Sequence, residues 1–386
     1  MRNLRNIHSS FAESETGLQL TACAWDVSTD NLICAFGPSK TDVSLHLKRW
    51  KNATASPNSA EETESIYVDI ASWDAPCPLP YLQCDEVVSL HYFSDSLTAC
   101  LVLAGGDLIV VREEPGTGEE KIQIVGSVDA GICAASWSPD EELLAVVTRA
   151  DTLLYMTRDF ENIADATFSA DDPKISKHVS VGWGKAETQF KGKGAKALRD
   201  PTMPEKIDEG VLSEFDKGNA TISWRGDGAY VATNNIVSEK RRVIRVYSRE
   251  GNLDSVSEPV DGLTGALSWR PSGNLLASVQ RFTDYVDVVF FERNGLRHGQ
   301  FSLRLSTEEM NDWAADISLV WNLDSSVLAV CFLDRIQLWT MGNYHYYLKQ
   351  EILQINGNAW MSSSLVWHPE RPLRFAMGTT GEFPMR

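Results

Sequence analysis

The chain has 386 residues, 43% of them hydrophobic, and a formal net charge of −18 at pH 7. This length is enough for a large buried core, whereas so acidic a chain is a poor match for binding nucleic-acid phosphates over its whole surface. The sequence has no apolar run of about 18 or more residues and no apolar segment behind Met1. We therefore expect a soluble intracellular protein, located in the cytoplasm and also in the nucleus.

A tryptophan recurs along the chain within nearly the same short string. The string is ASWSPD at 135–140, ISWRGDG at 222–228, LSWRPSG at 267–273, LVWNLD at 319–324 and LVWHP at 365–369. Steps of 45, 52 and 46 residues separate Trp224, Trp269, Trp321 and Trp367. A period of roughly 40–50 residues is typical of β-propeller repeats. We expect these tryptophans to pack between blades rather than to form a ligand cage.

Each repeat predicts four antiparallel strands, the content of one propeller blade. A polar turn follows the tryptophan, and two further apolar runs come after it. Second strands are expected at 143–147, 230–233, 275–279 and 327–332, third strands at 153–155, 243–247, 286–291 and 336–339, and fourth strands at 121–126, 298–305 and 344–352. Residues 103–109 predict a hairpin around Gly105-Gly106-Asp107.

This pattern predicts an all-β fold, a seven-bladed WD40-type β-propeller over residues 1–386 whose last blade is incomplete. The blade starts are near Trp25, Tyr92, Trp137, Trp224, Trp269, Trp321 and Trp367. Long loops are expected at 52–64 and 184–216, where polar residues and glycines lengthen the repeat. The last blade has room for its first strand and a second near 373–379, and residues 3–11 would supply one outer strand.

One group of basic residues is a candidate binding site. It lies in the second long loop and consists of Lys185, Lys191, Lys193, Lys196 and Arg199. The group is either a solvated loop or a basic arm that makes weak contact with RNA.

Two other charged groups are expected to lie in solvated turns. They are Asp171-Asp172, and Lys240-Arg241-Arg242 with Arg245 near the tip of a predicted hairpin.

No arrangement of residues indicates catalysis. The sequence has no Gly-x-Ser-x-Gly nucleophile turn, no Gly-x-x-x-x-Gly-Lys-Ser/Thr phosphate loop and no zinc-ligand spacing among its histidines. Its seven scattered cysteines are expected to be small buried hydrophobes rather than a disulfide framework. We therefore expect no enzyme activity, no cofactor and no metal.

Five strings, in order along the chain, resemble the largest, scaffold subunit of the Elongator complex, and its fungal members most of all. They are MRNL at 1–4, VSVGWGKAETQF at 179–190, ISWRGDG at 222–228, FFERNGLRHG at 290–299 and QLWTMGNYHYYLKQ at 337–350. The resemblance covers essentially the whole chain. It implies the first of two N-terminal propellers. In that family a helical region, a dimerisation region and a basic segment that contacts tRNA follow, and this sequence does not include them.

The resemblance also implies a function. The family's complex modifies the wobble uridine (U34) of tRNA anticodons, and the chemistry belongs to a different, radical-SAM and acetyltransferase-like subunit. The scaffold holds that catalytic subunit and joins a second WD40 subunit, so tRNA would be contacted indirectly or weakly and a membrane not at all. Two alternatives stay open, because a propeller alone does not specify function: a generic WD40 adaptor in another intracellular assembly, and the gating propeller of a serine peptidase without its catalytic domain.

Overall fold

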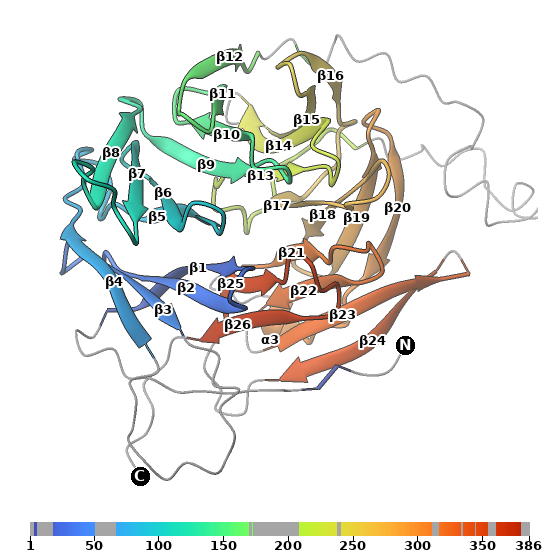
Figure 1. Ribbon diagram of the computed structural model, residues 1–386. Coiled ribbons are helices and arrows are strands. Elements are labelled where there is room, and N and C mark those ends of the chain that lie inside the picture. Colours follow the sequence, from blue (N-terminus) through green and yellow to red (C-terminus); the bar gives the residue numbers. More distant parts are fainter. Residues whose placement is uncertain are drawn as a thin grey trace, which may run out of the picture.

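The computed structural model describes residues 4–5, 18–50, 67–169, 172, 208–237, 241–310, 316–332, 335–343, 345–353 and 360–379. Their strands form seven separate antiparallel sheets, arranged in a ring (Figure 1). Six sheets have four strands, and the seventh has two within the described residues. The predicted all-β propeller is thereby confirmed, and its last blade is incomplete within the described residues.

Each of the first three blades is a meander in which consecutive strands are neighbours. Blade 1 consists of β1 (Leu20–Asp26), β2 (Asn31–Phe36), β3 (Ser44–Trp50) and β4 (Tyr67–Asp74). Blade 2 consists of β5 (Val87–Phe93), β6 (Thr98–Leu103), β7 (Asp107–Arg112) and β8 (Ile122–Ser127). Blade 3 consists of β9 (Ile132–Trp137), β10 (Leu143–Thr148), β11 (Thr152–Thr157) and β12 (Asn162–Thr167).

The remaining blades repeat this order. Blade 4 consists of β13 (Thr221–Trp224), β14 (Tyr230–Val237), β15 (Arg241–Ser248) and β16 (Leu253–Val256). Blade 5 consists of β17 (Leu263–Trp269), β18 (Leu275–Arg281), β19 (Val286–Glu292) and β20 (Arg297–Ser302), and the short helix α3 (Thr307–Met310) follows it. Blade 6 consists of β21 (Ser318–Trp321), β22 (Leu328–Phe332), β23 (Arg335–Gly342) and β24 (His345–Leu353). Blade 7 has β25 (Trp360–Trp367) and β26 (Phe375–Thr379).

The first strand of each blade lies innermost, beside the first strands of its two neighbours, and β25 lies beside β1 (Figure 1). Three tryptophans at the ends of these strands reach across to the preceding blade. The indole Nε1 donates to a carbonyl oxygen in each case: Trp224 to Ser136 at 2.9 Å, Trp367 to Val320 at 3.1 Å and Trp25 to Val366 at 3.1 Å. In each pair the acceptor directly precedes the neighbouring blade's own tryptophan, so at these three junctions the repeated string bonds one blade to the next.

The hydrophobic core lies between blades rather than within them. Trp224 and Val231 of blade 4, for example, share a buried cluster with Ala145 and Leu153 of blade 3. A single blade has no such partner, so the stability of each blade depends on its neighbours.

The chain near its N-terminus lies against blades 6 and 7. Within 3–11 the structure describes only Leu4 and Arg5, and neither residue is in a strand. The amide of Leu4 donates to Gln350 Oε1 at 2.7 Å, and its carbonyl accepts from Gln350 Nε2 at 3.0 Å. The outer strand expected from 3–11 stays a prediction. The loop expected at 52–64 and residues 184–207 of the loop expected at 184–216 lie outside the described residues.

No helix in the part of the chain that the structure describes is long and apolar enough to cross a membrane.

Candidate functional site at the insertion base and the ring closure

The longest connection between blades runs from β12 of blade 3 to β13 of blade 4. It contains the basic group predicted to contact RNA, whose members all lie outside the described residues: Lys185, Lys191, Lys193, Lys196 and Arg199. The structure describes both ends of this connection, residues 168–169 with Asp172, and residues 208–220. We call these two ends the insertion base.

A buried ion pair holds the N-terminal side of the insertion base. The Nε of Arg245 in β15 donates to Asp172 Oδ2 at 2.7 Å, and the arginine side chain is 0% exposed. Its two other nitrogens donate to Asn235 Oδ1 at 2.9 Å and to the carbonyl of Ser169 at 3.1 Å. The guanidinium also lies 4.9 Å above the ring of Phe168. This arginine therefore has a partner on every side, as a buried charge requires.

A second ion pair holds the C-terminal side. Both oxygens of Asp216 accept hydrogen bonds from the guanidinium of Arg242, one of them at 2.6 Å, and the two side chains are 1% and 4% exposed. This two-point geometry is the strong form of an arginine–carboxylate pair. The amide of Gly218 donates to the same carboxylate at 2.7 Å.

Residues 208–215 are fastened to blade 5. Asp261 Oδ1 accepts the backbone amides of Glu209, Gly210 and Val211 at 2.8–3.0 Å. The guanidinium of Arg281 lies 4.2 Å above the ring of Phe215. The returning end of the insertion is thus bound to blades 4 and 5 before it enters β13.

The structure contradicts the prediction that Arg242, Arg245 and Asp172 lie in solvated turns. All three are buried, and both arginines belong to β15. Because they lie three residues apart in a strand, they point to opposite faces of blade 4. Arg245 meets Asp172 on the side of blade 3, while Arg242 lies close to Gly265 of blade 5. Their partners come from the insertion, so the local pattern carried no signal of burial. Lys240 and Asp171 lie outside the described residues.

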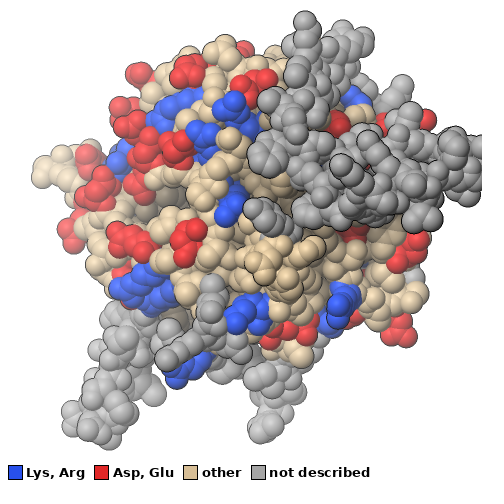
Figure 2. Space-filling model, turned by 90° about the vertical axis from the view of Figure 1, so that its right-hand side faces the viewer, with Lys and Arg blue, Asp and Glu red and all other residues tan. Residues whose placement is uncertain are grey.

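Surface charge is mixed on one face of the protein. Figure 2 shows Lys and Arg side chains interspersed with Asp and Glu on the face that it presents. The coloured, described part of that face therefore offers no continuous basic track of the kind that binds a nucleic-acid backbone.

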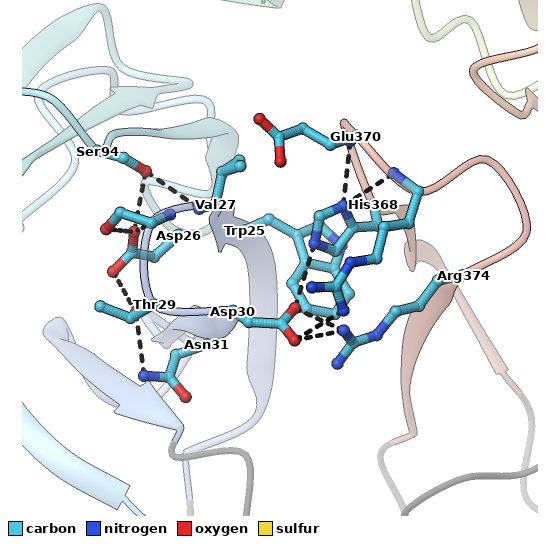
Figure 3. A network of polar contacts seen from close by, with 12 residues as sticks. Trp25, Asp26, Val27, Thr29, Asp30, Asn31, Ser94, His368, Glu370 and Arg374 are labelled. Carbon is cyan, nitrogen blue, oxygen red and sulfur yellow. Dashed lines mark hydrogen bonds and ion pairs between the residues drawn. The ribbon is translucent and has the colours of Figure 1, made fainter.

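A second charged cluster closes the ring between blade 1 and blade 7 (Figure 3). Asp30, in the turn after β1, accepts hydrogen bonds from His368 Nε2 at 3.2 Å, from Arg371 at 3.0 Å and from Arg374 at 2.6 Å. The ring of Trp25 packs 4.8 Å from that of His368, and the Arg374 guanidinium lies 5.1 Å above the indole. Burial alone would raise the pKa of Asp30, but the hydrogen bond and charge of Arg374 outweigh it and lower that pKa.

His368 is held as a neutral imidazole. Its Nδ1 accepts the backbone amides of Glu370 and Arg371 at 3.1 and 3.2 Å, and its Nε2 faces the carboxylate of Asp30. The proton must therefore sit on Nε2, because backbone amides only donate and an ionised carboxylate only accepts. Burial lowers the pKa of His368, and this outweighs the opposing effect of Asp30.

Another carboxylate, that of Asp26 at the end of β1, joins blade 1 to blade 2. Asp26 is 0% exposed and accepts from Ser28, Thr29, Arg49 and Ser94. Burial alone would raise the pKa of Asp26, but these hydrogen bonds reverse the effect and lower it strongly. The end of β1 and the turn after it thus use two carboxylates to bind both neighbouring blades.

Lowering the pH is expected to weaken the ring closure through His368. Its pKa is lowered in the folded state, so below about pH 6.5 the unfolded chain binds a proton that the folded chain does not. Stability should therefore fall as the pH drops from about 7.5 to about 5.5, by at most about 1.4 kcal/mol per pH unit for one histidine. Urea denaturation at several pH values measures this slope.

The variant His368→Asn, which keeps an acceptor for the two backbone amides, should show a smaller slope. His298→Asn provides the control, because His298 is 54% exposed. An unchanged slope in His368→Asn would mean that other groups cause the pH dependence.

Within each of the two clusters, the insertion base and the ring closure, the charged side chains pair with each other. The ion pairs are satisfied within the protein, which suits rigid attachment of one segment to another rather than proton transfer to a substrate. Over the described residues, no group of three or more His, Cys, Asp or Glu side chains is placed to hold a metal ion.

Comparison with known proteins gives consistent matches. Residues 1–370 match a family model described as ELP1 first N-terminal β-propeller. Elongator complex protein 1 of Schizosaccharomyces pombe is 49% identical over 292 residues, and that of Saccharomyces cerevisiae is 44% identical over 333 residues. These alignments cover 74% and 77% of this chain, but the chain spans only 22% and 24% of the length of these relatives.

Two solved structures share the fold at low sequence identity. The WD40 domain of Toxoplasma gondii coronin superposes with a TM-score of 0.53 and 9% identity, covering 88% of this chain and 71% of that one. A chain of the mitotic checkpoint complex superposes with a TM-score of 0.50 and 13% identity, covering 92% of this chain and 90% of that one. These similarities concern the propeller fold alone.

Proposed function

The chain belongs to the Elongator complex protein 1 family, and from this premise we propose that it forms the first propeller of the Elongator scaffold subunit. The observation that carries the proposal is its identity of 49% and 44% with the two fungal relatives over most of its length. In this role the chain is non-catalytic. It supports modification of the wobble uridine (U34) of tRNA by helping to hold the subunit that performs the chemistry.

The architecture fits a holding role. Indole-to-carbonyl bonds join three pairs of neighbouring blades, and Asp26 and Asp30 link blade 1 to both neighbours. A ring held in this way presents its loops and outer strands in fixed positions, which is what a protein that binds several partners at once needs. The partners proposed are the radical-SAM and acetyltransferase-like catalytic subunit and a second WD40 subunit, in the cytoplasm or also in the nucleus.

Affinity purification tests this proposal. The tagged chain is expressed in fungal cells that contain Elongator, and the captured proteins are identified by mass spectrometry. The coronin WD40 domain, carrying the same tag, is a suitable control because it shares the fold but not the sequence. Other Elongator subunits should be enriched on the chain and absent from the control. Enrichment of a different assembly would favour the adaptor alternative, and recovery of peptidase activity would favour the gating propeller.

Any RNA binding by this chain is expected to be weak and sensitive to salt. The five basic residues of the insertion would neutralise about three to five phosphates, which predicts a slope of about −2 to −3.5 in a plot of log affinity against log salt concentration. Changing Lys191, Lys193 and Lys196 to Glu should abolish this binding. Filter binding or fluorescence anisotropy with tRNA over a salt series measures it.

The control variant changes the net charge equally at exposed positions outside the insertion sequence: Lys40→Glu, Lys121→Glu and Arg304→Glu. This variant should keep most of the tRNA affinity. Equal loss in the two variants would show that net charge, rather than the insertion, governs the contact.

A further inference from the structure

Two cysteines face each other across the first hairpin of blade 1. Cys23 in β1 and Cys34 in β2 are direct partners in the antiparallel register. Their sulfur atoms are 3.9 Å apart, and both are free thiols. Directly opposed residues in an antiparallel pair have Cβ atoms about 4.5–5.5 Å apart, and a disulfide needs about 3.5–4.5 Å. Joining the two sulfurs therefore requires rotation of both side chains together with a slight approach of β1 to β2.

The two thiols differ in how solvent reaches them. Cys34 is 3% exposed, while Cys23 is half-buried. Both belong to the apolar cluster between blade 1 and blade 7, together with Trp25, Val366 and Ala376. A small oxidant in solution therefore reaches the sulfur of Cys23 more readily than the buried sulfur of Cys34.

We propose that Cys23 and Cys34 form a redox-active site that a peroxide converts into a reversible disulfide. This inference does not depend on the proposed Elongator role, because it rests on the register of β1 and β2 and on the distance between the two sulfurs.

The reaction balances with hydrogen peroxide as the two-electron oxidant. The thiolate of Cys23 attacks one peroxide oxygen, the O–O bond breaks, and Cys23 becomes a sulfenic acid as one water leaves. The thiolate of Cys34 then attacks the sulfur of that sulfenic acid, the S–O bond breaks, and a second water leaves as the S–S bond forms. The two sulfurs together lose two electrons, and the peroxide gains them.

The environment of Cys34 affects the second step. In the reduced pair its hydrogen bond with Cys23, and then its burial, raise the pKa of the Cys34 thiol well above the ordinary value, and the burial remains once Cys23 is a sulfenic acid. The attacking thiolate is therefore scarce at neutral pH, and disulfide formation should accelerate as the pH rises.

The location gives the disulfide a structural consequence. Trp25 lies two residues after Cys23 on the same strand, and its indole bonds to the carbonyl of Val366 in blade 7. A covalent link between β1 and β2 would remove freedom from the hairpin that closes the ring. The oxidised and reduced proteins should therefore differ in hydrogen exchange at this junction.

Peptide mapping of the whole chain tests the proposal. The only cysteines between Arg5 and Lys40 are Cys23 and Cys34, so trypsin places both in one peptide, residues 6–40. Cys77, Cys84 and Cys100 fall in a different peptide, residues 52–112. The folded protein is treated with hydrogen peroxide, unfolded, alkylated with iodoacetamide and digested. Peptide 6–40 should lose two hydrogens and take up no alkyl group, and reduced glutathione should restore two alkylatable thiols.

Two controls keep the result decisive. Cys331 is the only cysteine of its tryptic peptide and should remain alkylatable. In Cys34→Ser the sulfenic acid on Cys23 has no resolving thiol, so dimedone should label Cys23 several-fold more than in the unchanged protein. If that variant does not fold, mapping of the unchanged protein still decides.

The proposal fails if peptide 6–40 carries two alkyl groups after peroxide treatment, or if Cys23 is oxidised to a sulfinic acid while Cys34 stays alkylatable. Equal dimedone labelling with and without Cys34 would also overturn it. A disulfide that reduced glutathione does not open would contradict reversibility.

Discussion

Replacing Arg245 with methionine is expected to lower the free energy of unfolding by about 3–5 kcal/mol, the usual cost of removing one partner of a buried ion pair. The Arg245 side chain is fully buried, and without it the carboxylate of Asp172 loses its ion-pair partner inside the protein. Methionine retains most of the apolar stem of arginine, so the loss of unfolding free energy comes mainly from removing the guanidinium charge. Urea denaturation followed by tryptophan fluorescence measures the change.

Arg158→Met is the matched control, because Arg158 pairs with Asp95 near the surface, where the two side chains are 39% and 61% exposed. This variant should lose no more than about 1 kcal/mol. The double variant Arg245→Met with Asp172→Leu should recover much of the loss, since no unpaired charge remains buried. Equal losses in Arg245→Met and Arg158→Met would show that the buried pair does not hold the insertion base.

The strands of this propeller are predictable from the sequence because the features that determine them are local. Alternation of apolar residues, the polar turn after each tryptophan and the repeat period all involve residues close together in the sequence. A strand expected at 143–147 is β10 (Leu143–Thr148), and one expected at 298–305 is β20 (Arg297–Ser302). The ends differ by one to three residues, because a strand ends where its partner strand ends rather than where its own pattern stops.

The charged clusters are not predictable in this way, because their partners are distant. Asp172 lies 73 residues from Arg245, and Asp30 lies 344 residues from Arg374. In the sequence each arginine looks like a surface residue in a polar context, and only the fold shows that a carboxylate meets it. Arginine side chains are seldom fully buried unless they are paired, so a sequence that shows no partner predicts an exposed arginine.

The cysteine pair was missed for a related reason. Cys23 and Cys34 are 11 residues apart in sequence. Whether they face each other depends on the register of β1 against β2, which shifts between Leu20 and Ala22. A slip of one residue would put the two side chains on opposite faces of the sheet. The expectation of buried cysteines holds for Cys34, Cys100 and Cys331, whereas Cys23, Cys77, Cys84 and Cys133 are only partly buried. Composition carries no information about register.

Trp269→Ala is expected to lower the free energy of unfolding by about 3–5 kcal/mol, which is the usual range for a buried aromatic side chain. Trp269 is 2% exposed and packs among Leu276 and Phe291 of its own blade and Ile244 of blade 4. Its backbone amide donates to the hydroxyl of Ser223 at 2.8 Å, and its indole Nε1 donates to the carbonyl of Gly273 at 3.2 Å. The side chain therefore fills the layer between blades 4 and 5 and also anchors the turn that follows β17.

Two further variants separate these contributions in the same denaturation experiment. Trp269→Phe keeps much of the packing and loses the indole hydrogen bond, so it should cost less than alanine, with about 1 kcal/mol of the loss due to that bond. Tyr81→Ala removes an aromatic side chain that is 63% exposed and should change stability by no more than about 0.5 kcal/mol. The alanine variant should lower the denaturation midpoint without changing the slope, because the ring unfolds as a unit when one inter-blade layer is weakened. An unchanged midpoint in Trp269→Ala would mean that the repeated tryptophan is dispensable for packing. In that case its recurrence along the chain would need another explanation.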